Sequence, residues 1–269
     1  MTNNKYGNTY SNQLNILQYN LNKNRTTTDS LLNHPDTAQF MVLLLQEQYW
    51  SRYTNSSLTH HSWTYIESTT LAERPQRSAI YVNNKILSST TFKQVHIPFN
   101  NITAITIMTN DNQYKPTLLI NIYNPRDSDL ILMLRQYLLQ HLNSQDYNNI
   151  IIGGDFNLHH PLWNPQNYTA QDDQADELME MMANHNLRLL LPSGTITYPT
   201  ATGGTTIDLV WGNEKAEENL LKCQISTDND HGSNHLPVRM ILDIQPQMHL
   251  PSLSTSLQLC KNRLEDPRN

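Results

Sequence analysis

IIIGGDFN, residues 150–157, is the stretch of sequence that best indicates how this chain folds. Its three consecutive isoleucines predict a strand that is covered on both faces. The two glycines let the backbone turn closely, so that Asp155 and Asn157 arrive at the strand end, where both side chains can project into one pocket. Taken alone, the stretch also suits an ordinary turn, because Gly, Asp and Asn are common turn residues. The rest of the sequence is needed to distinguish an ordinary turn from a functional site.

The composition limits the classes of protein to consider. A chain of 269 residues is long enough for one large β-rich domain with a substantial core. Its net charge of −6 provides no overall basic surface, so a nucleic-acid partner would have to be attracted by a local patch or by bound metal cations. The two cysteines, Cys223 and Cys260, are too few for a disulfide scaffold or a cysteine-rich zinc site and suit a reducing compartment.

The two ends of the chain differ in composition from its middle. Residues 1–13 are polar and lack the apolar segment of a signal peptide, so we expect a flexible leader there. Residues 14–244 form the expected domain, and residues 245–269, rich in Pro, Ser, Gln and Leu, are expected to be a tail or linker. No apolar run is long enough to cross a bilayer. These features predict an intracellular protein, nuclear or cytoplasmic, with no membrane partner.

Most of the domain is predicted to consist of short strands separated by Asn, Asp and Pro turns. Besides the opening stretch, strands are predicted at residues 13–20, 40–45, 78–82, 90–96, 102–109, 117–123, 189–191, 195–198, 205–211 and 238–244. Amphipathic helices are predicted at residues 127–143 and 172–186, and a short helix is expected through Leu31 and Leu32, capped by Asp29 or Ser30. The strands between residues 78 and 123 read as an antiparallel run.

Polar residues of a particular kind recur at the ends of these apolar strands or inside them. They are Asn20, Glu47, Tyr123, Asp155, Asn157, Asp208 and His235. Carboxylate and amide oxygens together make a hard oxygen site, which suits Mg²⁺, or Mn²⁺ in its place, better than zinc. A histidine beside a carboxylate is held in one tautomer and, when protonated, can contact a phosphate. The set therefore indicates phosphoryl transfer to water.

The order and spacing of these motifs resemble the endonuclease/exonuclease/phosphatase superfamily. The matching motifs are Asn20 at a strand end, Gln46-Glu47, Tyr123-Asn124-Pro125, Gly154-Asp155-Phe156-Asn157, Thr206-Ile207-Asp208 and Ser233-Asn234-His235. Within that superfamily, residues 17–20, 154–163, 207–209 and 235–238 look like the endonuclease domain of LINE-type (non-LTR) retrotransposons. The resemblance covers roughly residues 14–244. It implies an α+β fold, a four-layer αββα sandwich of two mainly antiparallel sheets flanked by helices.

The resemblance also implies an activity and its partners. Such a domain is a Mg²⁺-dependent endonuclease that nicks one strand of a DNA duplex and leaves a 3′-hydroxyl for target-primed reverse transcription. A reverse transcriptase segment of a longer polyprotein would be a further partner. The basic residues that are candidates for DNA contact are Arg74, Arg77, Lys85 and Arg126.

The roles that the resemblance implies can be carried over residue by residue. Glu47 would hold the divalent metal, with Asn20 assisting. Asp155 would orient or deprotonate the attacking water, and Asn157 would steady that water or the phosphate oxygens. Tyr123 would contact the phosphate.

The last motif carries the catalytic histidine and also a departure from the family pattern. His235, paired with Asp208, would stabilise the charge that develops on the phosphate. The family usually has Ser-Asp-His here, whereas this chain has Asn234 in place of the aspartate. Either the acid is dispensable, or activity is reduced, or the nearby Asp228 or Asp230 substitutes for it.

Two other functions fit the same residues. One is a phosphatase or phosphodiesterase of the same fold that acts on a small molecule or a lipid headgroup, because only the surface loops choose the substrate. The other is a catalytically impaired, retroelement-derived module that binds nucleic acid, an interpretation that Asn234 keeps open.

Overall fold

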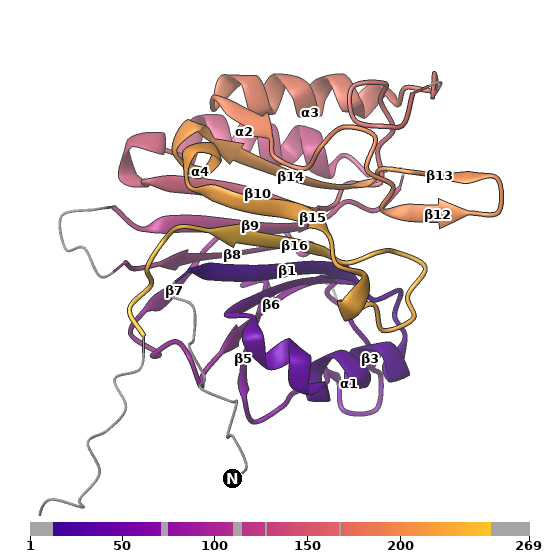
Figure 1. Ribbon diagram of the computed structural model, residues 1–269. Helices are drawn as coiled ribbons and strands as arrows, with labels where there is room; N and C mark the ends of the chain where they lie inside the picture. The colour runs from indigo at the N-terminus through magenta and orange to yellow at the C-terminus, as the bar shows by residue number, and fades with distance from the viewer. Residues whose placement is uncertain (1–12, 71–74, 110–114, 127, 167, 249–269) are drawn as a thin grey trace, which may run out of the picture.

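Two six-stranded β-sheets packed face to face make up the body of the protein (Figure 1). The computed structural model describes residues 13–70, 75–109, 115–126, 128–166 and 168–248. Helices α2 and α3 cover the outer face of one sheet, and α1 covers the outer face of the other (Figure 1). The predicted α+β fold with four αββα layers is confirmed.

The first sheet has the order β15-β16-β1-β2-β6-β5 and the second has the order β11-β14-β10-β9-β8-β7. The strands of the first sheet are β15 (Leu220–Ile225), β16 (Val238–Leu242), β1 (Leu14–Asn20), β2 (Val42–Gln46), β6 (Ser78–Asn83) and β5 (Trp63–Glu67). Those of the second are β11 (Leu187–Leu189), β14 (Asp208–Asn213), β10 (Asn149–Asp155), β9 (Thr117–Tyr123), β8 (Ile102–Ile107) and β7 (Phe92–Val95).

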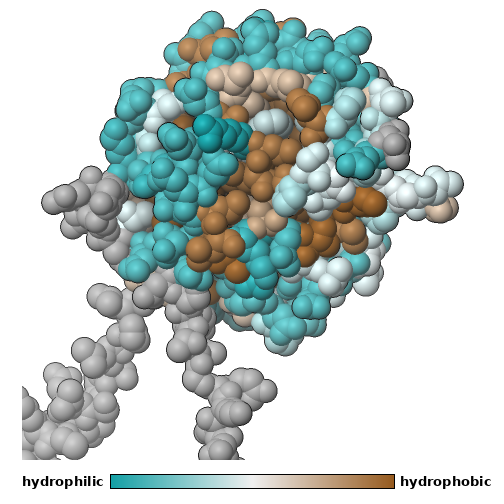
Figure 2. All heavy atoms as spheres, turned by 45° about the horizontal axis from the view of Figure 1, so that its top comes forward, coloured by the Kyte–Doolittle hydropathy of each residue, from teal (hydrophilic) through white to brown (hydrophobic). Residues whose placement is uncertain are grey.

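The remaining elements lie outside the two main sheets. The helices are α1 (Arg25–Asn33), α2 (Leu130–His141), α3 (Asp173–Asn184) and α4 (Glu214–Glu218), with 3₁₀ turns at Pro35–Gln39, Ser144–Asp146 and Thr227–Asn229. Two small hairpins are formed by β3 (Trp50–Ser51) with β4 (Ser56–Ser57), and by β12 (Tyr198–Thr200) with β13 (Gly203–Thr205). The β12–β13 hairpin stands out from the body (Figures 1 and 2).

Each main sheet contains one parallel pair within an otherwise antiparallel arrangement of its described strands. In the first sheet β1 runs parallel to β2, and in the second β9 runs parallel to β10. The sequence pattern predicted an antiparallel run of strands between residues 78 and 123. The structure has such a run for β7, β8 and β9, whereas β6 belongs to the first sheet, where it pairs with β2 and β5. Helix α2 then reverses the direction of the chain before β10 begins, as a crossover helix does between parallel strands.

Three apolar layers account for the stability of this arrangement. The layer between the sheets includes Leu44 and Ile151, the layer under α2 and α3 includes Ile150 and Ile152, and the layer under α1 includes Leu43. The three isoleucines of β10 therefore alternate between two cores, which explains why all three are apolar. Figure 2 turns the side of the molecule that carries α2 and α3 toward the viewer. On this side, apolar surface (brown) is bordered by hydrophilic side chains (teal).

Several boundaries differ from the sequence prediction. Helix α1 begins at Arg25, and its cap is Asn24, whose side chain accepts a hydrogen bond from the Thr27 N–H, rather than Asp29 or Ser30. The bounds predicted for the strands at 195–198 and 205–211 are wrong, because residues 198–205 fold back on themselves to form the β12–β13 hairpin. Strands β5 and β15 were not predicted, since alternate side chains there are partly exposed and polar.

The two ends of the chain lie mostly outside the described residues. Among the described residues of the predicted tail, Pro246 bridges to Thr109 and Met248 bridges to Leu87, so residues 245–248 contact the body of the domain. None of the helices in the described ranges is long and apolar enough to span a membrane.

Gly154 is a position where only glycine fits. Its φ is +149°, and a Cβ built there would lie 1.9 Å from the carbonyl oxygen of Ile122 on the neighbouring strand β9. At Gly153 the same Cβ would lie 3.5 Å from Leu44 Cδ1, which is an ordinary contact. The second glycine therefore allows β10 to stay paired with β9 up to Asp155.

This difference gives a stability test with a built-in control. We expect Gly154→Ala to lower the free energy of unfolding by more than about 3 kcal/mol, because the clash is with main-chain atoms. Gly153→Ala should cost less than about 1 kcal/mol. Urea unfolding followed by circular dichroism measures both, and equal stability of the two variants would contradict the account.

Candidate active site

The candidate residues lie where the carboxyl ends of the two parallel strand pairs meet. In the first sheet Asn20, the last residue of β1, is in register with Gln46, the last residue of β2, so that Glu47 follows directly. In the second sheet Asp155 is in register with Tyr123 on one side and with Asp208 on the other. Because the sheets pack face to face, residues far apart in the sequence are brought to one edge of the sandwich.

Asp155 is buried at the centre of this edge. Its Oδ1 accepts a hydrogen bond from the Asn157 N–H at 3.0 Å, and its Oδ2 accepts one from Asn20 Nδ2 at 2.7 Å and another from Asn157 Nδ2 at 3.1 Å. Burial, followed by the nearby Asp208 carboxylate, raises the pKa of Asp155 well above its usual range. The carboxyl group is therefore disposed to accept a proton.

His235 lies between two aspartates. Its Nδ1 is 2.8 Å from Asp208 Oδ2, and its Nε2 is 4.0 Å from Asp155 Oδ2. Burial alone would lower the pKa of His235, but the charge and hydrogen bond of Asp208 outweigh it, helped by Asp155, and raise the pKa to about 9. The Tyr198 ring and the imidazole pack in a T-shaped arrangement, with ring centres 5.0 Å apart. The histidine is thus held as a cation in one orientation.

A chain of hydrogen bonds between buried amide side chains leads from the core to Asp208. Gln18 Nε2 donates to Asp208 Oδ1 at 3.0 Å and to Gln46 Oε1 at 2.8 Å, and Gln46 in turn donates to Asn121 Oδ1. Asn121 Nδ2 donates to the carbonyl oxygens of Leu45 and Ala79. Since Gln18 and Gln46 belong to the first sheet and Asp208 and Asn121 to the second, these hydrogen bonds join the sheets beneath the site.

Glu47 has an unusual backbone and an unusual partner. Its φ is +47°, a conformation that non-glycine residues seldom adopt and that is often found at functional sites. Its Oε1 lies 2.7 Å from Lys23 Nζ. The Tyr123 hydroxyl forms a hydrogen bond with the Glu47 carboxylate, and burial, followed by this acid, raises the pKa of Tyr123, which therefore stays protonated.

The donor set fits a hard divalent cation. Asp155, Asp208 and His235 place ligand atoms within 4.8 Å of one another, and no other His, Cys, Asp or Glu residues in the described ranges form such a group. Both Asp208 oxygens already accept hydrogen bonds, whereas the buried Glu47 Oε1 faces the Lys23 ammonium at 2.7 Å. Asn20 Oδ1 accepts from the Asn22 N–H. Carboxylate oxygens without cysteine suit Mg²⁺ or Mn²⁺.

Asn234 is exposed at the rim of the site. Its Nδ2 is 3.5 Å from the Tyr198 hydroxyl, and Ser233 beside it donates to the Asn20 carbonyl oxygen at 2.7 Å. Asp230 lies in a separate contact, where its Oδ1 accepts from the Tyr19 hydroxyl at 2.7 Å and from the Gly232 N–H at 2.9 Å. That Asp230 takes the role of the acid replaced by Asn234 therefore stays a prediction.

The four basic candidates are not all near the site. The carbonyl oxygen of Arg77 accepts a hydrogen bond from the Glu47 N–H at 2.8 Å, so Arg77 lies beside the site. Lys85 follows the opposite end of β6, where Val82 pairs with Val42, so the structure separates it from the site. Arg74 lies outside the described residues.

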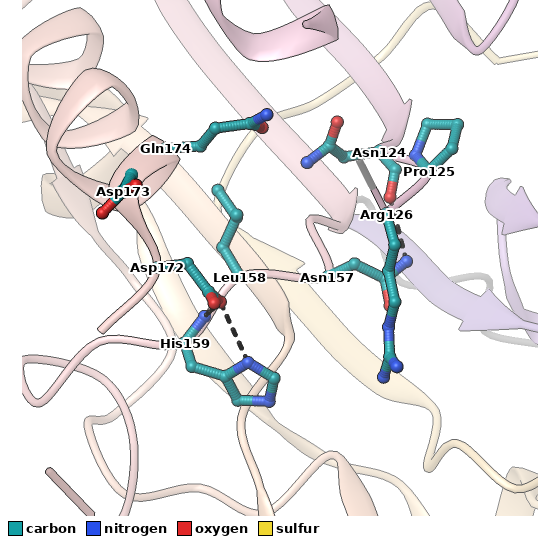
Figure 3. A pocket seen from close by; sticks show the side chains of 9 residues that line it. All are labelled: Asn124, Pro125, Arg126, Asn157, Leu158, His159, Asp172, Asp173 and Gln174. Carbon is teal, nitrogen blue, oxygen red and sulfur yellow. Dashed lines mark hydrogen bonds and ion pairs between the residues drawn. The ribbon is translucent and has the colours of Figure 1, made fainter. Parts of the chain in front are cut away.

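Arg126 lines a pocket of about 380 Å³ next to Asn157 (Figure 3). Across the pocket, Asp172 Oδ2 accepts hydrogen bonds from the His159 N–H at 2.6 Å and from its ring Nδ1 at 3.0 Å (Figure 3). Arg126, one of the predicted DNA-contact residues, therefore lies close to Asn157, a candidate for positioning the attacking water.

Comparison with solved structures places this geometry in a known fold. The endonuclease domain of TRAS1, a telomere-specific non-LTR retrotransposon, is similar with a TM-score of 0.67 and 19% identity, covering 86% of this chain and 99% of that one. The fold is that of the endonuclease/exonuclease/phosphatase superfamily. The catalytic domain of APE2 from Xenopus laevis (TM-score 0.63, 17% identity, 86% and 92% covered) and an AP endonuclease from Archaeoglobus fulgidus (0.60, 12%, 86% and 99%) are also similar.

Sequence comparison agrees with the structural likeness. A family model described as endonuclease-reverse transcriptase matches residues 117–239, while no curated protein matches the chain. The predicted resemblance to the superfamily, and within it to the endonuclease domains of non-LTR elements, is confirmed. Residues that the sequence analysis did not single out are Lys23, Gln18, Asn121 and Tyr198, and Gln46 was named only as part of the Gln46-Glu47 motif. Polar residues inside the apolar strands were the available signal for the three amides.

The pKa of His235 provides a direct test of the pairing with Asp208. Since the pKa is higher in the folded protein than the ordinary 6.5, the pair stabilises the metal-free fold fully below pH 6.5 and loses this contribution as the pH rises through about 9. NMR titration of the imidazole in EDTA should show a midpoint well above 6.5. Asp208→Asn should lower it to about 6.5 or below. An unchanged midpoint in Asp208→Asn would contradict the assignment.

Proposed function

We propose that this chain is a divalent-metal-dependent DNA endonuclease that nicks one strand of a duplex and leaves a 3′-hydroxyl for target-primed reverse transcription of a LINE-type element. The observation that carries the proposal is the placement of His235 Nε2 4.0 Å from Asp155 Oδ2, with Asp208 behind the imidazole. The similar TRAS1 domain and AP endonucleases support a nucleic-acid substrate, and the matching family model supports a reverse transcriptase segment as a partner in the same polyprotein. A nuclear or cytoplasmic location belongs to the same proposal.

Asp155 is assigned to the attacking water. Its raised pKa suits a general base near neutral pH, because such a base accepts a proton most effectively when its pKa is close to the working pH. Asn157, which donates to Asp155 Oδ2 and to the Asn124 carbonyl oxygen, is held beside it and would steady the water. Attack of the water on phosphorus would break the bond to O3′, with one proton of the attacking water passing to Asp155. The released O3′ would take a proton from a solvent water, which gives a 5′-phosphate and a 3′-hydroxyl.

The phosphate is assigned to the cationic side of the site. His235, kept protonated by Asp208, would donate a hydrogen bond to a nonbridging oxygen as negative charge develops there. The protonated Tyr123 hydroxyl would contact the same phosphate. Mg²⁺, when held by Glu47 with Asn20 assisting, would supply further positive charge at this phosphate.

Surface features support a large substrate. The projecting β12–β13 hairpin begins at Tyr198, which packs against His235, so a duplex that contacts the hairpin would lie over the site. Arg77 and Arg126 lie at the same edge of the sandwich. These features favour DNA over a small molecule or lipid headgroup.

A plasmid nicking assay tests the proposal. Supercoiled DNA in Mg²⁺ or Mn²⁺ should be converted to the open circular form with 3′-hydroxyl ends. Asp155→Ala should lower the rate by about a hundredfold or more, as expected for loss of a general base. Asn234→Asp should leave the rate within about tenfold of the natural protein.

Three outcomes would contradict the proposal. Nicking that Asp155→Ala leaves unchanged would come from a contaminant. Nicking that appears only in Asn234→Asp would identify an impaired, nucleic-acid-binding relic. Hydrolysis of p-nitrophenyl phosphate without nicking of DNA would identify a phosphatase of the same fold.

A further inference from the structure

Two adjoining turns follow the parallel strands β1 and β2. Lys23 has a φ of +58° and Glu47 has a φ of +47°, so both turns use the left-handed region. The Lys23 N–H donates to the Glu47 carbonyl oxygen at 2.7 Å, and the Leu21 N–H donates to the Gln46 carbonyl oxygen at 2.8 Å. These main-chain hydrogen bonds fix the two turns to each other and bring the two side chains to the same place.

The side chains form an ion pair of unequal exposure. Lys23 Nζ lies 2.7 Å from Glu47 Oε1, with 52% of the lysine side chain exposed but only 9% of the glutamate side chain. The main-chain hydrogen bonds already hold the turns, so the ion pair is not needed to fix their position. Its effect is to neutralise a nearly buried carboxylate, which would otherwise be costly to keep ionised.

We propose that Lys23 is a built-in competitor of the divalent cation and sets the metal affinity of the site. The inference rests on the proposed function, in which Glu47 holds that cation. Because the ammonium occupies the same carboxylate oxygen, a divalent ion can bind there only when Lys23 Nζ moves away. A half-exposed lysine with a flexible four-carbon chain can do so.

Competition of this kind has a definite consequence. Removing the ammonium takes the cationic partner away from the Glu47 carboxylate and also removes repulsion between Lys23 and the incoming ion. Both effects favour the metal, so variants without the positive charge should bind it more tightly, by about three- to tenfold. A lysine that only supported the turn would have the opposite effect, because its loss would loosen the site.

The experiment measures Mn²⁺ binding by the EPR signal of the free ion, without substrate. Lys23→Met removes the charge and keeps the length of the side chain, and Lys23→Gly removes the charge and also relieves the left-handed backbone. Lys23→Arg retains the charge and should bind Mn²⁺ as weakly as the natural protein. Lys222→Met is the matched control, since Lys222 is an exposed lysine on β15. Circular dichroism and thermal unfolding verify that each variant is folded.

The outcomes separate this inference from the proposed function. Tighter Mn²⁺ binding in both Lys23→Met and Lys23→Gly, with Lys23→Arg and Lys222→Met unchanged, supports competition. Unchanged or weaker binding in Lys23→Met and Lys23→Gly overturns it, provided that Glu47→Gln still weakens binding. If Glu47→Gln has no effect on Mn²⁺ binding, the assignment of the metal to Glu47 fails, and the inference fails with it.

Discussion

The hydrogen bond from Gln18 Nε2 to Asp208 Oδ1 joins the two sheets at the point on which the candidate site depends. Both residues are fully buried, and a buried carboxylate is stable only when its oxygens are paired. Gln18 satisfies one oxygen and His235 the other, so Asp208 cannot turn without leaving a donor or an acceptor unpaired. The orientation of the imidazole is thus tied to the packing of the first sheet on the second.

The parallel strand pairs explain why the other polar residues meet here. Parallel strands end at the same edge of a sheet, and each sheet contributes one such pair, β1 with β2 and β9 with β10. Asn20 and Asp155 end two of these four strands and hydrogen-bond to each other across the interface between the sheets. Gly154 keeps β10 close to β9 up to that point. Geometry of the sandwich, rather than any single loop, assembles the candidate site.

Local patterns in the sequence predicted which residues stand at strand ends, and the structure confirms the fold that the motifs implied. Asp155, Asp208 and His235 were each identifiable because an acid or a histidine next to an apolar strand is conspicuous. Their partners were not, because Gln18 and Asp208 are 190 positions apart and strand order cannot be read from periodicity. The role of Lys23 could not be predicted either, since its contact with Glu47 depends on two left-handed turns that no turn motif in the sequence indicates.

The most direct test of this account is a double-mutant cycle between Gln18 and Asp208, measured as the free energy of unfolding in urea. Gln18→Leu, Asp208→Leu and the double variant each remove one or both partners of the bond between the sheets. The account predicts a coupling energy of at least about 1 kcal/mol, as expected for a buried hydrogen bond to a charged group. Additive effects, within about 0.5 kcal/mol, would contradict it and would mean that the sheets hold the site without this bond.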